Sequence, residues 1–312
     1  MRDSEIPVGT ATVLTGEPSG RLKMVAAIAA VAVAAVLICA KAVAYFATGS
    51  VSLLSTLVDS LLDLAASIIN LIAIRHAAQP ADREHRFGHG KAEPLAGLGQ
   101  STFIAGSAVF LLVQAGERLV QRQPISNEAI GIGVMMLSIV LTLGLVLLQR
   151  RVTRTTGSLA IGADALHYKS DLLVNIGVIG ALLLSTQLGW RLADPLFAIG
   201  VAVYILYCAW QIFSGSFHLL MDRELPDADR ARIRNIALAH PSVFNIHDLR
   251  TRSSGTQAFI QFHLELDGNL TLIDAHAIAD SVMRDVERAF PNAEVLIHED
   301  PHGIPEPRAK FD

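Results

Sequence analysis

Six long apolar segments constrain the fold of this chain more than any other feature of its sequence. A helix needs about 20 mostly apolar residues to cross the hydrocarbon layer of a membrane. We expect such helices in the regions 24–47, 51–74, 95–116, 129–148, 172–190 and 196–217. The composition agrees, because 52 % of the residues are hydrophobic, 17 % are charged, and the mean hydropathy is +0.44. These values exclude a disordered chain and argue against a wholly water-soluble one.

The charge balance changes where the last apolar segment ends. Residues 1–221 contain 15 Lys and Arg against 13 Asp and Glu, and residues 222–312 contain 10 against 16. No strongly basic surface is present, so nucleic acid is not an expected partner. We predict four parts, namely a flexible tail (1–20), a six-helix membrane domain (21–221), a soluble domain (222–302) and a C-terminal tail (303–312).

Basic residues near the ends of the apolar segments predict the orientation. The N-terminal side and the loops after the second and fourth segments carry ten Lys or Arg, and the opposite side carries three. Because short cytoplasmic loops are enriched in basic residues, we expect both termini in the cytoplasm of a bacterial inner membrane. The only cysteines, Cys39 and Cys208, lie in apolar segments, which predicts buried thiols without a disulfide or a thiolate metal site.

The acidic C-terminal part alternates between two periodicities. Residues 227–239 and 272–290 follow a helical period, whereas residues 243–252, 258–266 and 294–298 have the character of strands. The order helix, strand, strand, helix, strand predicts a small α+β domain with its helices on one face of a sheet. A domain of roughly 80 residues has a marginal core, so dimerisation would help to stabilise it.

The strongest functional signal lies within the apolar segments. Asp59 and Asp63 are four residues apart in the second segment. His167 and Asp171 are four apart directly before the fifth, where a helix continued upstream would include them. Positions four apart share a helix face, so two facing helices would bring four ligand groups together. Each carboxylate at bilayer depth costs about 2.5–3.5 kcal/mol to insert, which a purely structural role would not explain.

The ligand types indicate the ion. Three carboxylates and an imidazole suit tetrahedral Zn²⁺, with Fe²⁺, Co²⁺ or Cd²⁺ as alternatives, and disfavour Mg²⁺ and Ca²⁺. Metal binding to these groups must displace protons, as an antiporter requires. The alternative is a structural ion pair, for which Lys41 and Lys169 are the only lysines within the expected helices.

Two further clusters contain metal-ligating side chains. Asp82, His85 and His89 follow the second apolar segment at spacings of three and four. Solvated loop histidines are equally common in such a pattern, so both interpretations stay open. The soluble domain contains four histidines and an acid, for which we favour metal binding over isolated core histidines. These residues are His247, His263, His276, His298 and Asp300.

Taken together, these motifs resemble the cation diffusion facilitator family, and most closely its bacterial YiiP-type zinc transporters. The resemblance extends from about residue 22 to 301 and rests on four segments. They are residues 59–63, 85–93, 167–171 and 247–252.

The resemblance implies roles for the clustered residues. The four intramembrane residues match the family's transport site, the loop residues match a second site, and the soluble-domain residues match a binuclear site with Asp300 as the bridge. Lys91 and Asp222 match a charge pair near the contact between two protomers. The fold implied is six transmembrane helices with a ferredoxin-like, metallochaperone-like domain that mediates homodimerisation.

Some residues depart from the family pattern. Lys169 and Glu299 stand where neutral side chains are commoner, and neither His302 nor the C-terminal tail has an assigned role. Asp164 shares the helix face of His167. It could serve as a proton acceptor or a gate residue, but we favour a solvated carboxylate at a helix end.

We therefore predict a homodimeric membrane transporter that exports Zn²⁺, with Cd²⁺ or Fe²⁺ as further candidates, in exchange for protons. A zinc-responsive membrane sensor and a passive divalent-cation channel are the alternatives. An enzyme is disfavoured, because four protein ligands leave a tetrahedral ion no open position for substrate.

Overall fold

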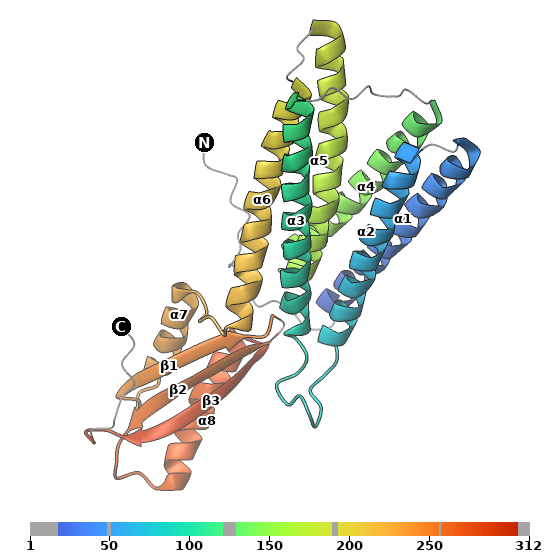
Figure 1. Cartoon of the computed structure of the whole chain (residues 1–312). Helices are drawn as coiled ribbons and strands as arrows, with labels where there is room; N and C mark the ends of the chain where they lie inside the picture. Colours follow the sequence, from blue (N-terminus) through green and yellow to red (C-terminus); the bar gives the residue numbers. More distant parts are fainter. Residues whose placement is uncertain (1–17, 49–50, 121–128, 189–192, 256, 305–312) are drawn as a thin grey trace. The chain divides into compact units, whose positions relative to one another are not determined.

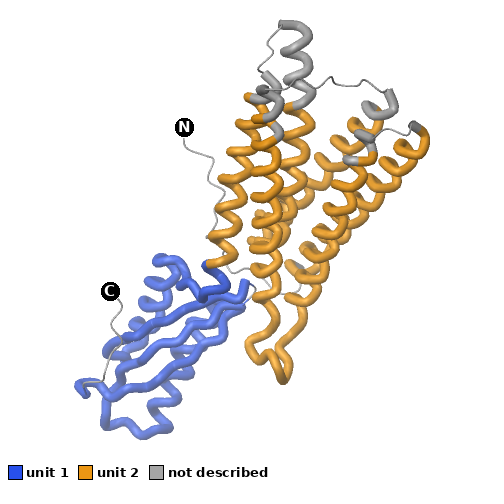
Figure 2. Tube along the Cα trace, viewed as in Figure 1, with its two compact units in different colours: residues 1–17, 218–312 blue, residues 18–217 orange. Residues whose placement is uncertain are grey.

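The computed structural model describes residues 18–48, 51–120, 129–188, 193–255 and 257–304. The chain divides into two compact units, one of residues 18–217 and one that begins at His218 (Figure 2). The first unit is helical, and the second combines two helices with a three-stranded sheet (Figure 1). The predicted fold class, a helical membrane domain followed by an α+β domain, is confirmed.

Six long helices form the first unit, where the sequence predicts six spans. Their bounds are α1 (Pro18–Thr48), α2 (Val51–Ala77), α3 (Ala92–Val120), α4 (Ala129–Thr156), α5 (Leu159–Leu188) and α6 (Ala193–Leu220). Within the described residues, all but α5 contain a stretch long and apolar enough to cross a membrane. Residues 18–20, assigned from the sequence to the N-terminal tail, belong to α1. Residues 1–17 and most of the C-terminal tail lie outside the described residues.

Helix α5 contributes to all three buried apolar clusters of this unit, and two of them join it to different groups of helices. Its first turn packs with α1, α2 and α4 in a cluster that includes Ala26, Ile74 and Val152. Farther along, Leu166 of α5 packs with α3 and α6 in a cluster that includes Cys208. A displacement of α5 therefore affects both groups of helices, because packed interiors do not deform continuously.

Buried polar contacts also connect these helices. The Lys23 ammonium of α1 donates to Glu93 of α3 over 2.8 Å, and both side chains are buried. Ser67 of α2 and the Tyr168 hydroxyl of α5 are 2.9 Å apart in a buried hydrogen bond. The second contact joins the two helices that carry the intramembrane acids.

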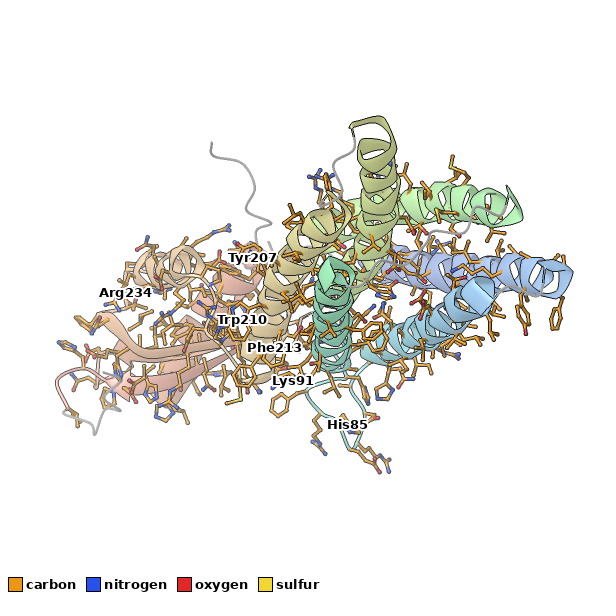
Figure 3. The ribbon with its side chains drawn as sticks, turned by 45° about the horizontal axis from the view of Figure 1, so that its top comes forward. His85, Lys91, Tyr207, Trp210, Phe213 and Arg234 are labelled. Carbon is orange, nitrogen blue, oxygen red and sulfur yellow. The ribbon has the colours of Figure 1, made fainter. Side chains whose placement is uncertain are left out.

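Helix α6 exposes a row of aromatic side chains. Figure 3 shows Tyr207, Trp210 and Phe213 along this helix, and the Trp210 and Phe213 rings stack at 5.9 Å. Tyr207 and Trp210 are exposed in the isolated chain. Such a surface is unfavourable in water and normal in contact with lipid or another apolar surface.

The second unit contains α7 (Asp227–Leu238), β1 (Asn245–Ser253), β2 (Ala258–Leu266), α8 (Leu272–Ala289) and β3 (Ala293–Pro301). The strand order is β1-β2-β3, with β1 antiparallel and β3 parallel to β2. Apolar side chains of both helices and the sheet form one core that includes Ile233, Phe262 and Val286. The predicted order of elements is confirmed, although β3 is longer at both ends than the predicted strand because it pairs with the whole of β2.

Candidate metal sites

The first candidate site lies between α2 and α5. Asp63 Oδ1 is 2.8 Å from His167 Nε2, and Asp171 Oδ2 is 3.9 Å from the same nitrogen. One ligand atom from each of the three residues lies within 4.8 Å of the others. The structure thus brings together three of the four side chains predicted for the intramembrane site.

Asp59 is the fourth predicted residue, and it lies outside this group of three. Its side chain is exposed on α2, one turn before Asp63. A spacing of four residues keeps the two acids on one face of α2. Coordination by all four residues would therefore require the Asp59 side chain to move into the group.

Two lysines of the membrane unit, Lys41 and Lys169, were the candidate partners of these acids, and neither forms a described ion pair with them. Lys41 donates to the Thr56 carbonyl oxygen at 3.1 Å and to Ser60 Oγ at 2.6 Å. Lys169 donates to the Tyr204 hydroxyl at 2.6 Å. Among the described residues, neither lysine forms an ion pair with an acid of the group, which weakens the interpretation of the acids as a structural ion pair.

Asp164 differs from our expectation of a solvated carboxylate. It is 0 % exposed, and each of its oxygens accepts a hydrogen bond from a glutamine amide. Gln100 of α3 donates over 2.9 Å, and Gln149 of α4 donates over 2.5 Å. The expectation was wrong because α3 and α4 cover this part of α5, which the sequence of α5 cannot reveal.

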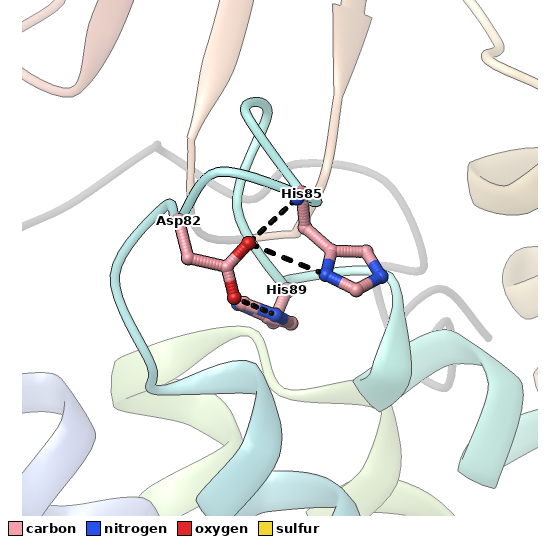
Figure 4. A group of neighbouring side chains, drawn as sticks. All are labelled: Asp82, His85 and His89. Carbon is pink, nitrogen blue, oxygen red and sulfur yellow. Dashed lines mark hydrogen bonds and ion pairs between the residues drawn. The ribbon is translucent and has the colours of Figure 1, made fainter.

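The second candidate site is the loop between α2 and α3 (Figure 4). Asp82 Oδ1 is 3.5 Å from His85 Nδ1, and Asp82 Oδ2 is 3.4 Å from His89 Nε2. A carboxylate between two imidazoles matches the donor set of many zinc sites. The buried Nδ1 atom of His89 has no hydrogen-bond partner among the described residues.

Backbone hydrogen bonds fold the loop so that its ligands converge. Asp82 Oδ1 accepts from the backbone N–H groups of Glu84 at 2.9 Å and His85 at 2.6 Å. These bonds, first of all the one from His85, hold the pKa of the Asp82 carboxyl below its usual value. Gly88 has φ of +76°, a conformation that favours glycine and that returns the chain toward His89.

The third candidate site lies across the sheet of the second unit. His247, His263 and His298 are register partners in β1, β2 and β3, so the three histidines form a row. Asp300 Oδ2 is 3.2 Å from His247 Nε2 and 2.7 Å from His263 Nδ1. The other oxygen, Oδ1, is 3.1 Å from His298 Nε2. Asp300 therefore has one oxygen directed to each end of the row, which fits a bridging carboxylate.

Unpartnered polar atoms indicate that this cluster suits a cation. Asp300 is 5 % exposed, and its Oδ1 atom forms no hydrogen bond with described residues despite its distance to His298. The buried Nδ1 of His247 also forms no hydrogen bond there, although Asp248 Oδ2 lies 3.7 Å away. Buried polar groups are normally satisfied, so these atoms favour a ligand between the side chains.

Two residues predicted for the second unit, His276 of the third site and Asp222 of the charge pair, lie apart from the group around Asp300. His276 lies on α8 and contacts Asp280 at 3.8 Å and Glu299 at 3.9 Å, so it is not part of the group around Asp300. Asp222 pairs with Arg252 at 3.6 Å within the second unit. Its predicted partner Lys91 belongs to the first unit, and the charge pair stays a prediction.

Several side chains at these sites were not found from the sequence. Gln100 and Gln149 hold Asp164, Glu265 is 2.9 Å from His302 Nδ1, and the His76 ring lies beside that of His89. An amide in an apolar helix is a usable signal, because polar groups in lipid need partners. Glu265 and His76 carry no such signal, since neither lies in a segment predicted to cross the membrane.

The fold and the three groups define a membrane protein that places metal-ligating side chains both between its apolar helices and in a soluble domain. Residues 27–221 match the family model of the cation efflux transmembrane domain. Residues 225–302 match the model of the cation efflux protein cytoplasmic domain.

Curated relatives match almost the whole chain. A cation-efflux pump FieF of Salmonella paratyphi A is 48% identical over 94% of this chain and 98% of its own length. The FieF pump of Shewanella oneidensis is 53% identical over 88% of this chain and 92% of its own length.

Among solved structures, the chain is similar to the metal-bound C-terminal domain of the CzcD transporter from Thermotoga maritima. The identity is 30%, the match covers 25% of this chain and 93% of that one, and the TM-score is 0.25. A structure of the transporter CzrB is 33% identical, with 25% of this chain and 99% of that chain covered and a TM-score of 0.25.

This chain belongs to the cation efflux family, also called the cation diffusion facilitators. It is a divalent cation efflux transporter of the membrane, not an enzyme, and the predicted family is confirmed.

Proposed function

We propose that this protein exports Zn²⁺ from the cytoplasm in exchange for protons. The group formed by Asp63, His167 and Asp171 carries the proposal, because it places carboxylate and imidazole ligands between apolar helices. With Asp59, the group would provide a tetrahedral set of three oxygens and one nitrogen, which suits Zn²⁺. Cd²⁺ and Fe²⁺ are further substrates that this set could hold.

Exchange for protons follows from the chemistry of the ligands. Metal-bound imidazole and carboxylate must be deprotonated, so cation binding and protonation compete for the same atoms. The 2.8 Å contact between His167 and Asp63 is one that a shared proton can maintain when the cation has left. Protons can therefore displace Zn²⁺ on the release side.

The proposed transport step is a movement of α2 and α5 that exposes the site to each side of the membrane in turn. Ligands from two separate helices allow such a change, because a relative displacement alters the coordination geometry. Asp164 is proposed as a proton-binding or gating residue in this movement, since its buried carboxylate joins α5 to α3 and α4.

The remaining sites are proposed to respond to cytoplasmic zinc. The loop group would bind Zn²⁺ through Asp82, His85 and His89. The group around Asp300 would bind it in the soluble domain and stiffen a homodimer, with Lys91 and Asp222 near the contact. Both termini would lie in the cytoplasm, with the dimer in the inner membrane and in contact with lipid.

Flux measurements on purified protein in liposomes test the proposal. We expect a pH gradient to drive Zn²⁺ transport. Zinc entry into the lumen should make the lumen more alkaline, and zinc exit should make it more acidic, because protons move in the opposite direction. Replacing Asp63 with Ala should abolish both signals, because one ligand of the shared site is lost.

Different results would support the alternatives. Zinc flux that follows voltage and ignores the pH gradient would indicate a passive channel. Zinc binding without any flux would indicate a sensor. Undiminished flux in Asp63→Ala would remove the intramembrane group from the mechanism.

A further inference from the structure

His76 lies beside the loop group and has no role in the functions described above. It occupies the last turn of α2, and its ring centre is 4.6 Å from that of His89, with the rings near perpendicular at 70°. The same separation of 4.6 Å joins His89 to His85. His89 is therefore flanked by two imidazoles at equal distance.

These distances match those of the other histidine cluster. In the soluble domain, the ring centres of His247 and His263 are 4.9 Å apart and those of His263 and His298 are 4.7 Å apart. Two imidazoles on one tetrahedral ion, each with a Zn–N bond of about 2.0–2.1 Å, have ring centres about 5 Å apart. The spacing of His76 and His89 is thus suitable for a common ion.

The loop group lacks one ligand for a closed tetrahedral site. Asp82, His85 and His89 supply three ligand atoms within 4.8 Å of one another, and zinc sites that are not catalytic are almost always four-coordinate. The His89 side chain is 4 % exposed, and its Nδ1 atom is unpartnered among the described residues. The group is therefore partly buried, and an ion held by its three ligands would have a fourth coordination position without a protein ligand.

The His76 side chain is free to supply the missing ligand. It is exposed, and it makes no side-chain hydrogen bond or ion pair with any described residue. His76 is not among the residues whose ligand atoms lie within 4.8 Å of one another, so its side chain would have to rotate to bring a ring nitrogen into the group. Such a rotation would break no side-chain hydrogen bond of His76.

We propose that His76 is the fourth protein ligand of a divalent cation held by Asp82, His85 and His89. This inference rests on the proposed loop site and adds a residue from α2 to it. Coordination by His76 would connect the loop to the helix that carries Asp59 and Asp63, so occupancy of the loop would restrict the C-terminal end of α2.

Cobalt binding to the full-length protein in detergent tests the proposal. Asp63→Ala and Asp300→Ala are introduced together as a background, so that the other two groups are disabled. In this background, His76→Ala should weaken Co²⁺ binding by about tenfold or more, since even outer-shell changes cost 10–100-fold. The visible d–d bands should also lose the intensity typical of tetrahedral Co²⁺. Gln79→Ala, an exposed position in the turn that follows α2, is the matched control and should change neither.

His76→Cys provides a test that does not depend on a loss of signal. A thiolate at position 76 that ligates Co²⁺ should add a sulfur-to-cobalt charge-transfer band in the near ultraviolet. The background protein retains Cys39 on α1 and Cys208 on α6, so it controls for the native thiols.

The outcomes separate this inference from the proposed loop site. If the background protein binds no Co²⁺, the loop site itself is wrong, and His76 has no site to complete. If Co²⁺ binds but His76→Ala behaves like Gln79→Ala and His76→Cys adds no band, the loop site stands and the role of His76 is overturned.

Discussion

The intramembrane group and the soluble-domain group contain the same types of side chain, histidine and aspartate, but different secondary structure holds them. Asp63 comes from α2, whereas His167 and Asp171 come from α5. His247, His263 and Asp300 all lie on strands of one hydrogen-bonded sheet. Ligands on two helices can separate when the helices move, but neighbouring strands hold theirs at fixed register. The first arrangement suits a cation that must leave, and the second suits a cation that stays.

The largest expected effect tests this contrast directly. Changing His167 to Ala should abolish zinc flux, because the group loses its only imidazole, whereas Asp300→Ala should retain flux and lose zinc bound to the soluble domain. Flux in liposomes and zinc content after dialysis are the two measurements. Lys169→Ala, which alters α5 between His167 and Asp171 but not the group, is the matched control for flux. Loss of flux in Asp300→Ala to the level of His167→Ala would contradict the proposed division of roles.

Sequence patterns predict the chemistry of both groups better than their geometry. The spacing of four residues places His167 and Asp171 on one face of α5, and the apolar surroundings mark them as functional. The row of His247, His263 and His298 depends on strand register, which is fixed by a bulge between His247 and Arg250 and by tertiary packing. A single sequence contains no direct measure of that register.

The misinterpretation of Asp164 has a related physical origin. The residue is close to the start of α5, where a carboxylate often faces water. Its burial depends on Gln100 and Gln149, which lie on helices 64 and 15 residues away in the sequence. The amides of the two glutamines donate hydrogen bonds to the buried Asp164 carboxylate. Neither the sequence of α5 nor the apolar periodicity of the chain indicates that these side chains lie in contact.

Asp164 bears on this contrast because it joins α5, one of the two helices proposed to move, to α3 and α4. In Asp164→Ala, two buried glutamine amides lose their acceptor, and each unsatisfied group costs about 1–3 kcal/mol. We expect a lower midpoint of thermal unfolding in detergent. Asp164→Asn keeps the shape of the side chain and one of the two acceptor oxygens, but it cannot bind a proton as a carboxylate does. It should therefore recover part of this stability.

Transport in Asp164→Asn separates a structural role from a role in proton exchange. If Asp164 takes up a proton during transport, Asp164→Asn should be folded yet show an altered dependence of zinc flux on lumenal pH. The same pH profile as the unmodified protein would assign Asp164 to helix packing alone. A Gln149→Leu variant controls for loss of the hydrogen bond with the carboxylate intact.

The smallest effect concerns the loop between α2 and α3, where Asp82, His85 and His89 lie outside both helices and strands. The lowered pKa of Asp82 means that the folded loop favours the ionised form of this carboxyl. The carboxylate therefore stabilises the folded loop fully at pH values above the ordinary aspartate pKa of 3.8. That contribution should be lost as the pH falls through the lowered value. Exchange protection of the Glu84 and His85 amides should therefore persist as the pH drops from 7 to 5 and disappear only in stronger acid. In Asp82→Asn, the protection should be weaker and insensitive to acid, because no carboxylate is present to titrate. Protection in the unmodified protein that disappears between pH 7 and 5 would show that histidine protonation, and not the Asp82 carboxylate, controls the fold of the loop.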